Sequence, residues 1–113
     1  MRDSNLLDLL LWILRLRLRF RVTGASMFPL LQPGDEVLID PRAFEKRPPQ
    51  VGDVVMAQHP TQPGLKIVKR VTAVLPDDHY QISGDNPSAS TDSRTFGPVS
   101  RQQILGLVTS RFG

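Results

Sequence analysis

The chain has 113 residues, enough for one domain with a single core, and this length excludes a large multidomain enzyme. It holds no cysteine and only two histidines, which excludes disulfides, cysteine nucleophiles and thiolate zinc clusters, so we expect no metal and no cofactor. The net charge of +3 is confined to residues 1–21, so no spread basic surface of the kind that binds nucleic acid is predicted.

The first predicted element is a short apolar helix over residues 1–14. Residues 6–14 are almost entirely apolar, and Asp3 or Ser4 could cap the start of the helix. The run is shorter than the roughly 20 residues of a spanning helix, and no small-residue cleavage site of a secretory signal follows it. We expect this helix to dock on its own domain, on a partner or on a bilayer surface, where the arginines of residues 1–21 would support peripheral contact.

Residues 15–113 are predicted to form a single β domain. Residues 15–22 alternate basic and apolar side chains, the period-2 pattern of a half-buried strand with its arginines on the solvated face. Later apolar runs are separated by turn sequences rich in proline, glycine and aspartate, and comprise residues 36–39, 53–58, 65–75, 79–82 and 104–108. Five or six strands with few helices predict a mainly β fold, either a small antiparallel barrel or a sandwich.

Ser26 is the candidate nucleophile. It lies just after a predicted strand and is preceded by Gly24 and Ala25, small residues that let another backbone approach closely. A serine hydroxyl becomes an effective nucleophile when a neighbouring base takes its proton. His59 and His79 could each serve as that base, although both lie in predicted turns or loops, where histidines are usually solvated.

Lys69 is the better candidate for the base. Strand alternation places it on the same face as Ile67 and Val71 and on the opposite face from Val68. An ammonium group among β-branched apolar side chains loses hydration, so its pKa falls and it can accept a proton near neutral pH. Taken alone, a strand lysine is more often an edge residue with its amine in water.

A third polar cluster spans residues 84–97. By itself it is typical of a polar loop held by Asx turns and a local pair between Asp92 and Arg94. Its density of hydroxyls and charges would also suit residues that orient a lysine and fix the walls of a cleft.

Taken in order, five motifs in residues 22–108 resemble the type I signal peptidase family of serine proteases. They are Gly24-Ala-Ser-Met-Phe-Pro29, Pro33-Gly-Asp-Glu-Val-Leu-Ile-Asp40, Gly52-Asp-Val-Val55, Lys69-Arg-Val71, and Gly84-Asp-Asn86 with Ser90, Asp92, Ser93, Arg94 and Gly97-Pro-Val99. Each motif recurs widely, but five in the right order are specific.

The resemblance implies the signal-peptidase catalytic-core fold and a Ser/Lys dyad. Ser26 would attack the scissile carbonyl, Lys69 would act as general base, and Ser90 would hydrogen-bond the lysine amine and orient it. Met27 and Pro29 would lie in the substrate cleft.

The same resemblance implies structural supports, in which Arg70 pairs with Asp85 and Asp92 pairs with Arg94. Many members carry a serine two residues before the nucleophile as an oxyanion-hole donor, and this chain has Gly24 there. The oxyanion hole is therefore expected to rest on the Ser26 amide and another backbone N–H.

The compact chain, with its His59-Pro60 loop, looks more like the nickel-type superoxide dismutase maturation proteases within this family. That resemblance implies a cytoplasmic serine endopeptidase that removes a short leader from the nickel superoxide dismutase precursor. The main alternative is a type I signal peptidase held at the membrane surface through residues 1–21 and acting on exported precursors. A self-cleaving Ser/Lys repressor-type protein and a non-catalytic binding module are two further alternatives.

Overall fold

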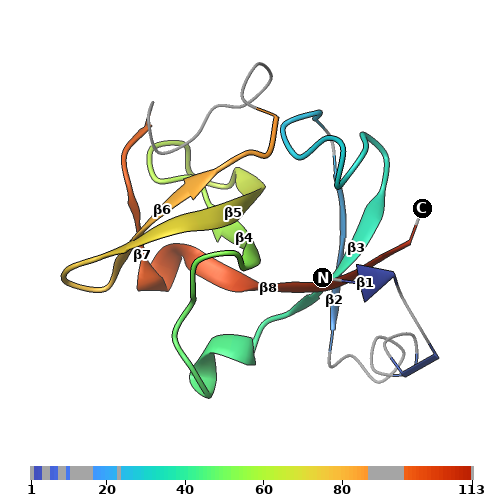
Figure 1. Cartoon of the computed structure of the whole chain (residues 1–113), viewed down its shortest axis with the longest axis horizontal. Helices are drawn as coiled ribbons and strands as arrows, with labels where there is room; N and C mark the ends of the chain where they lie inside the picture. The colour runs from blue at the N-terminus through green and yellow to red at the C-terminus, as the bar shows by residue number, and fades with distance from the viewer. Residues whose placement is uncertain are drawn as a thin grey trace.

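The computed structural model describes residues 2–3, 6–7, 10, 17–22, 24–86 and 96–112. Within these ranges, eight strands form one strongly curved sheet, a half-barrel (Figure 1). The strands and 3₁₀ helices are β1 (Arg2–Asp3), β2 (Leu18–Arg21), β3 (Glu36–Asp40), η1 (Ala43–Glu45), β4 (Val54–Gln58), β5 (Lys66–Leu75), β6 (His79–Ser83), β7 (Val99–Ser100), η3 (Arg101–Gln103) and β8 (Ile104–Phe112). The predicted mainly β fold is confirmed, in its barrel-like form rather than as two stacked sheets.

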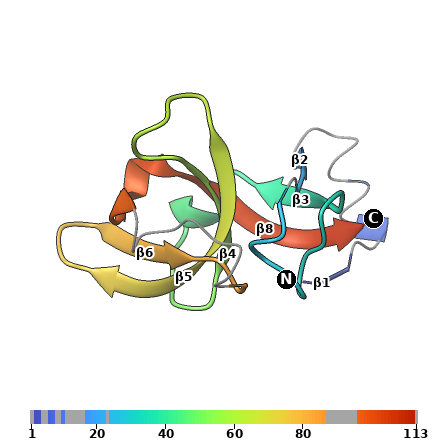
Figure 2. The same ribbon diagram turned by 90° about the horizontal axis from the view of Figure 1, so that it is seen from above.

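The strand order is β2-β3-β8-β4-β5-β6-β7, and every neighbouring pair on this path is antiparallel. β8 runs through both halves of the molecule, with β2 and β3 on one side and β5 and β6 on the other (Figure 2). The apolar pattern predicted a strand over residues 104–108, but β8 continues to Phe112. Its polar C-terminal half stays in the sheet because it pairs with β3 over residues 107–112.

The buried side chains form two clusters, and β4 contributes residues to both. Val54 and Met56 belong to the first core, and Val55 and Ala57 to the second, so successive residues of β4 point into different cores. A strand that is buried on both faces is apolar throughout rather than alternating. This explains the continuous run of apolar residues at the start of β4.

The first core lies beneath β2, β3 and the turn that carries Ser26. Its buried members are Val22, Met27, Leu31, Val37, Ile39, Val54, Met56, Val68 and Val108. The second core lies around β5, β6 and η1, and consists of Phe44, Val55, Ala57, Val71, Tyr80, Ile82, Val99 and Ile104. The segment that bears the candidate nucleophile is thus anchored in the first core, whereas β5 contributes to both.

The N-terminal segment departs from the prediction at Asp3. Instead of capping a helix, Arg2 and Asp3 form β1, which pairs in parallel with Ser110 and Arg111 of β8. This edge of β8 is open to a new strand because the pairing with β4 ends at Leu107. Residues 6, 7 and 10 have helical backbone and exposed side chains, while the rest of the predicted helix lies outside the described residues. No helix in the described ranges is long and apolar enough to cross a membrane.

The arginines of β2 are engaged with β3 rather than simply solvated. Arg19 and Arg21 both bond to the Glu36 carboxylate on the neighbouring strand. The hydrogen bond from Arg19 is the main cause that lowers the pKa of Glu36 below its usual value. Leu18, expected on the buried face, is 46% exposed, since β2 is the last strand on this side of the sheet and nothing covers its start.

Candidate active site

A pocket of about 320 Å³ lies between the two halves of the sheet. Its walls come from β2 and the turn after it (Phe20, Val22, Gly24, Ser26, Met27), from the β4–β5 loop (His59, Gln62) and from residues 65–69. A volume of this size is in the range of small ligand sites. The pocket therefore brings together Ser26 and Lys69, which are separated by more than forty residues in the sequence.

Ser26 sits on a turn that is fastened at both ends. The Val22 N–H donates to the Asp35 carbonyl at 2.8 Å, and the Leu31 N–H donates to the Met27 carbonyl at 2.9 Å. Met27 and Leu31 are buried in the first core. Ser26 itself is half-buried and lines the pocket. Its buried apolar neighbours thus hold the turn in place while the serine side chain stays accessible.

Lys69 is the only buried Lys, Arg, Asp or Glu among the residues that the structure describes, with 5% of its surface exposed. It lies in the middle of β5, directly opposite Val55 of β4. Lysine is almost never found fully buried unless its amine is paired. Burial disfavours the charged ammonium form, which is the physical requirement for a lysine that accepts a proton.

No hydrogen bond joins the Ser26 hydroxyl to the Lys69 amine, although both side chains line the same pocket. Catalytic hydrogen bonds are often long before substrate binds and tighten in the complex. The arrangement can therefore support proton transfer from the serine to the lysine once a peptide occupies the pocket.

Asn86 clamps the main chain on both sides of the Ser26 Cα. Its backbone N–H donates to the Ser26 carbonyl at 2.7 Å, and its side-chain Nδ2 donates to the Ala25 carbonyl at 3.0 Å. The sequence pointed to Asn86 only as part of the Gly84-Asp-Asn86 motif, without a role. A contact between positions 25 and 86 has no local signal, because it exists only once the sheet has folded.

Arg70 and Asp85 form a bidentate pair next to this clamp. Arg70 donates to the two Asp85 oxygens at 2.9 Å each, and to the Gly52 carbonyl at 3.0 Å. The hydrogen bond to Asp85 is the main cause that raises the pKa of Arg70 above its ordinary value. Since Arg70 follows Lys69 and Asp85 precedes Asn86, this pair ties the strand of the lysine to the clamp on the serine.

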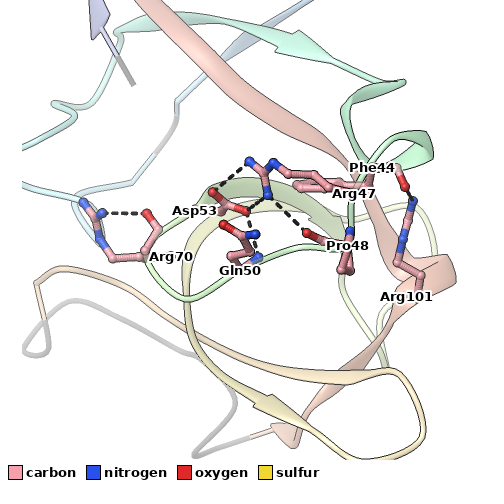
Figure 3. A network of polar contacts seen from close by, with 8 residues as sticks. Phe44, Arg47, Pro48, Gln50, Asp53, Arg70 and Arg101 are labelled. Carbon is pink, nitrogen blue, oxygen red and sulfur yellow. Dashed lines mark hydrogen bonds and ion pairs between the residues drawn. The ribbon is translucent and has the colours of Figure 1, made fainter.

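A second polar network fixes the entrance to β4 (Figure 3). Asp53 accepts two hydrogen bonds from Arg47, at 2.9 and 3.3 Å, and one from the Gln50 N–H at 2.8 Å. The guanidinium carbons of Arg47 and Arg101 lie over the Phe44 ring, 5.5 and 5.4 Å from its centroid. The Gly52-Asp53 motif therefore holds the start of β4 in place, and neither residue lines the pocket.

The remaining sequence-predicted residues divide into three groups. Met27 lines the pocket, whereas Pro29 is exposed and lies outside it, because the turn after Ser26 carries it toward solvent. His79 bonds to the Asp77 carbonyl and is not a pocket residue, whereas His59 is one. Three residues lie outside the described ranges: Ser90, Asp92 and Arg94.

Gly24 and Ser26 lie together on the wall of the pocket. Gly24 lines the pocket, and a Cβ atom built on it would meet nothing within 4 Å. Among the described residues, the Ser26 N–H has no hydrogen-bond acceptor, so it can donate to a bound carbonyl. Within the same ranges, no three His, Asp or Glu side chains gather as a metal site would require.

The chain matches the family model described as "Signal peptidase, peptidase S26" over residues 6–77 and 72–112. It is 38% identical over 112 residues to mitochondrial inner membrane protease subunit 2 of Danio rerio, covering 80% of this chain and 59% of that protein. It is 32% identical over 110 residues to mitochondrial ATP-independent inner membrane protease subunit 1b of Arabidopsis thaliana, covering 78% of this chain and 65% of that protein.

A bacterial relative is similar over a longer stretch. The chain is 26% identical over 149 aligned residues to a probable signal peptidase I-1 of Synechocystis sp., covering 88% of this chain and 76% of that protein. The chain spans less than two thirds of the length of the mitochondrial relatives named above.

Proposed function

Because the chain belongs to the signal peptidase family, peptidase S26, we propose that it is a serine endopeptidase with Ser26 as nucleophile and Lys69 as general base. The observation that carries the proposal is the shared pocket, into which the turn after β2 brings a serine and β5 brings a buried lysine. A buried lysine beside a serine is the arrangement expected of an activated hydroxyl nucleophile.

The proposed reaction is acyl transfer in two steps. The Ser26 Oγ attacks the scissile carbonyl carbon while its proton passes to the neutral Lys69 amine, and the Ser26 N–H donates to the developing oxyanion. The C–N bond then breaks, and Lys69 returns the proton to the leaving amine. Water attacks the resulting ester with Lys69 as base, which releases the leader's carboxylate and regenerates the Ser26 hydroxyl.

We propose that the substrates are precursor proteins with N-terminal leaders, cleaved at a membrane surface. Relatives named as inner membrane proteases and as a signal peptidase support this choice. Exposed apolar side chains support it too: Phe28 lies two residues from the nucleophile and Leu65 lines the pocket, at 47% and 42% exposure. Such side chains beside a pocket favour contact with lipid or with an apolar leader.

Nickel superoxide dismutase precursor is a second candidate substrate. The position of His59 on the pocket wall is the observation in its favour, because the His59-Pro60 loop carries the resemblance to the dismutase maturation proteases. The names of the relatives favour exported precursors over this dismutase precursor.

One experiment tests both substrates. The protein is incubated with an exported precursor and with nickel superoxide dismutase precursor, with and without vesicles that contain anionic lipid, and product masses are recorded. We expect cleavage of the exported precursor, stimulated by the vesicles in low salt because the basic N-terminal segment is attracted to anionic lipid. Cleavage of the dismutase precursor alone, without a vesicle effect, would favour the second candidate.

Variants of the same protein test the dyad. Ser26→Ala and Lys69→Ala should each abolish cleavage, whereas Lys46→Ala changes an exposed lysine outside the pocket and should leave the rate unchanged. Full activity in either dyad variant, with the fold verified by circular dichroism, would reject the assignment.

A further inference from the structure

His59 is a buried pocket residue that the dyad mechanism does not use. Only 7% of its surface is exposed, and it lines the same pocket as Ser26 and Lys69. Its ring packs against Phe96 at a centroid distance of 4.6 Å. In a buried imidazole, each of the two ring nitrogens is expected to have a hydrogen-bond partner.

The Nδ1 atom of His59 is an acceptor. The backbone N–H groups of Thr61 and Gln62 both point to it at 3.2 Å. Two donors converging on one ring nitrogen leave that nitrogen without a proton, so the neutral ring carries its proton on Nε2. The β4–β5 loop thereby selects the tautomer.

The same loop fixes the position of the ring. The His59 N–H donates to the Leu65 carbonyl at 2.8 Å, which closes the loop at its base. The Gln58 side chain donates to the carbonyls of His59 and Gln62, at 3.3 and 3.0 Å. The imidazole is therefore held in place before any substrate arrives, which reduces the entropy cost of using it.

The Nε2–H of His59 has no hydrogen-bond partner among the described residues. Among the residues that the structure describes, the other polar side chains of the pocket are those of Ser26, Gln62, Lys66 and Lys69, and none of its lining residues is a carboxylate. Since His59 lines the pocket, a hydrogen-bond acceptor that enters the pocket can meet this donor.

We propose that His59 is a specificity residue, whose Nε2–H donates to an oxygen on a substrate side chain that enters the pocket. The chain would then prefer leaders with an oxygen-bearing side chain, such as Asn or Thr, at one position near the cut over their apolar isosteres. A donor that a bound peptide shields from water without offering an acceptor costs free energy, so a substrate lacking the oxygen is disfavoured. This inference rests on the proposed function, since it concerns the peptide that the dyad cleaves.

The test uses leader peptides in isosteric pairs, Asn against Leu and Thr against Val, placed in turn at each position before the cut. We expect kcat/KM of the wild-type protein to favour the oxygen-bearing member about tenfold at one position, the scale of one hydrogen bond. In His59→Phe, which keeps a ring against Phe96 but lacks the donor, the ratio should fall below about twofold. No preference at any position, or one that survives in His59→Phe, would overturn the proposal.

Gln58→Leu is the matched control for damage to the loop. It removes two hydrogen bonds of the same loop, yet Gln58 does not line the pocket, so the preference should persist. Equal loss of the preference in Gln58→Leu would assign it to loop order and overturn the proposal.

Failure of the proposed function would be seen separately, as absence of cleavage of every peptide. Binding of the paired peptides to Ser26→Ala, followed by NMR through the His59 Nε2–H resonance, decides the inference in that case. Tighter binding and a shifted resonance with the Asn peptide alone would support it, and equal binding of both peptides would reject it.

Discussion

The side chain of Asn86 hydrogen-bonds the carbonyl of Ala25, and this contact orients the amide of Ser26. The Ala25 carbonyl accepts from Asn86 Nδ2 at 3.0 Å. That carbonyl and the Ser26 N–H belong to the same planar peptide group, so fixing one end fixes the direction of the other. With Gly24 in place of a side-chain donor, the Ser26 amide carries the proposed oxyanion hole, and Asn86 acts through it as a positioning residue.

Asn86→Ala should therefore lower kcat about tenfold with little change in KM, because an oxyanion donor acts mainly in the transition state. The backbone N–H of residue 86 still bonds to the Ser26 carbonyl in this variant, so the turn should stay folded. Steady-state kinetics with thermal melts are the measurement. A rise in KM at unchanged kcat would show that Asn86 shapes the peptide site instead.

Breaking the ion pair between Arg70 and Asp85 should lower both the free energy of unfolding and the cleavage rate. We expect a double-mutant cycle with Arg70→Ala and Asp85→Ala, read by urea unfolding, to give a coupling of about 1 kcal/mol, since both side chains are partly exposed. Each single variant should also lower turnover, because the pair joins the strand of Lys69 to the Asn86 clamp.

Arg21→Ala is the control for that cycle. Arg21 bonds to Glu36 at 3.2 Å on the edge of the sheet, away from the clamp. Because an exposed pair contributes little to stability, this variant should melt close to the wild-type protein and leave turnover unaltered. A loss of turnover as large as in Asp85→Ala would contradict the specific role of the Arg70–Asp85 pair.

Gly24→Ser should raise kcat, by up to about a hundredfold if its hydroxyl reaches the oxyanion. The position is open, since a Cβ there would meet nothing within 4 Å, so the serine fits without strain. Gly24→Ala adds the same Cβ without a donor and should leave kcat unchanged. Equal rates for both variants would place the oxyanion elsewhere in the pocket.

The cleavage rate should increase with pH over the range from about pH 6 to pH 9. The sign follows from the mechanism, because Lys69 accepts a proton only as the neutral amine and the neutral fraction grows as pH rises. Initial rates in buffers of constant ionic strength test this, alongside melting temperatures at each pH to exclude unfolding. A flat profile would remove Lys69 as the general base.

Gly106→Ala should destabilise the fold by about 1 to 3 kcal/mol, the usual cost of forcing an extra methyl group into a packed site. A Cβ on Gly106 would lie 2.5 Å from the Ile39 side chain and 2.8 Å from the Asp40 carbonyl, where β3 and β8 approach closely. Urea unfolding measures the loss. Gly34→Ala is not an equivalent control, because that residue has a φ of +91°.

Local patterns along the chain predicted the β class and most strand positions. Alternation and turn residues placed β3, β4, β5 and β6 within one or two residues, because burial on a sheet face imposes a period of two on local composition. The ordered motifs also singled out Ser26 and Lys69. These signals are local, because the residue type at each position depends on whether that position is buried or exposed.

Contacts between segments that lie far apart in the sequence became visible only in the folded chain. Examples are the pairing of β1 with β8 and the hydrogen bond from Asn86 to the Ala25 carbonyl. Another is His59, whose Nδ1 accepts from its own loop and whose side chain lines the same pocket as Ser26. Pairings along a sheet edge and hydrogen bonds across more than sixty residues leave no periodic trace in the sequence. Their partners are chosen by how the sheet curves and closes, which is a property of the whole chain.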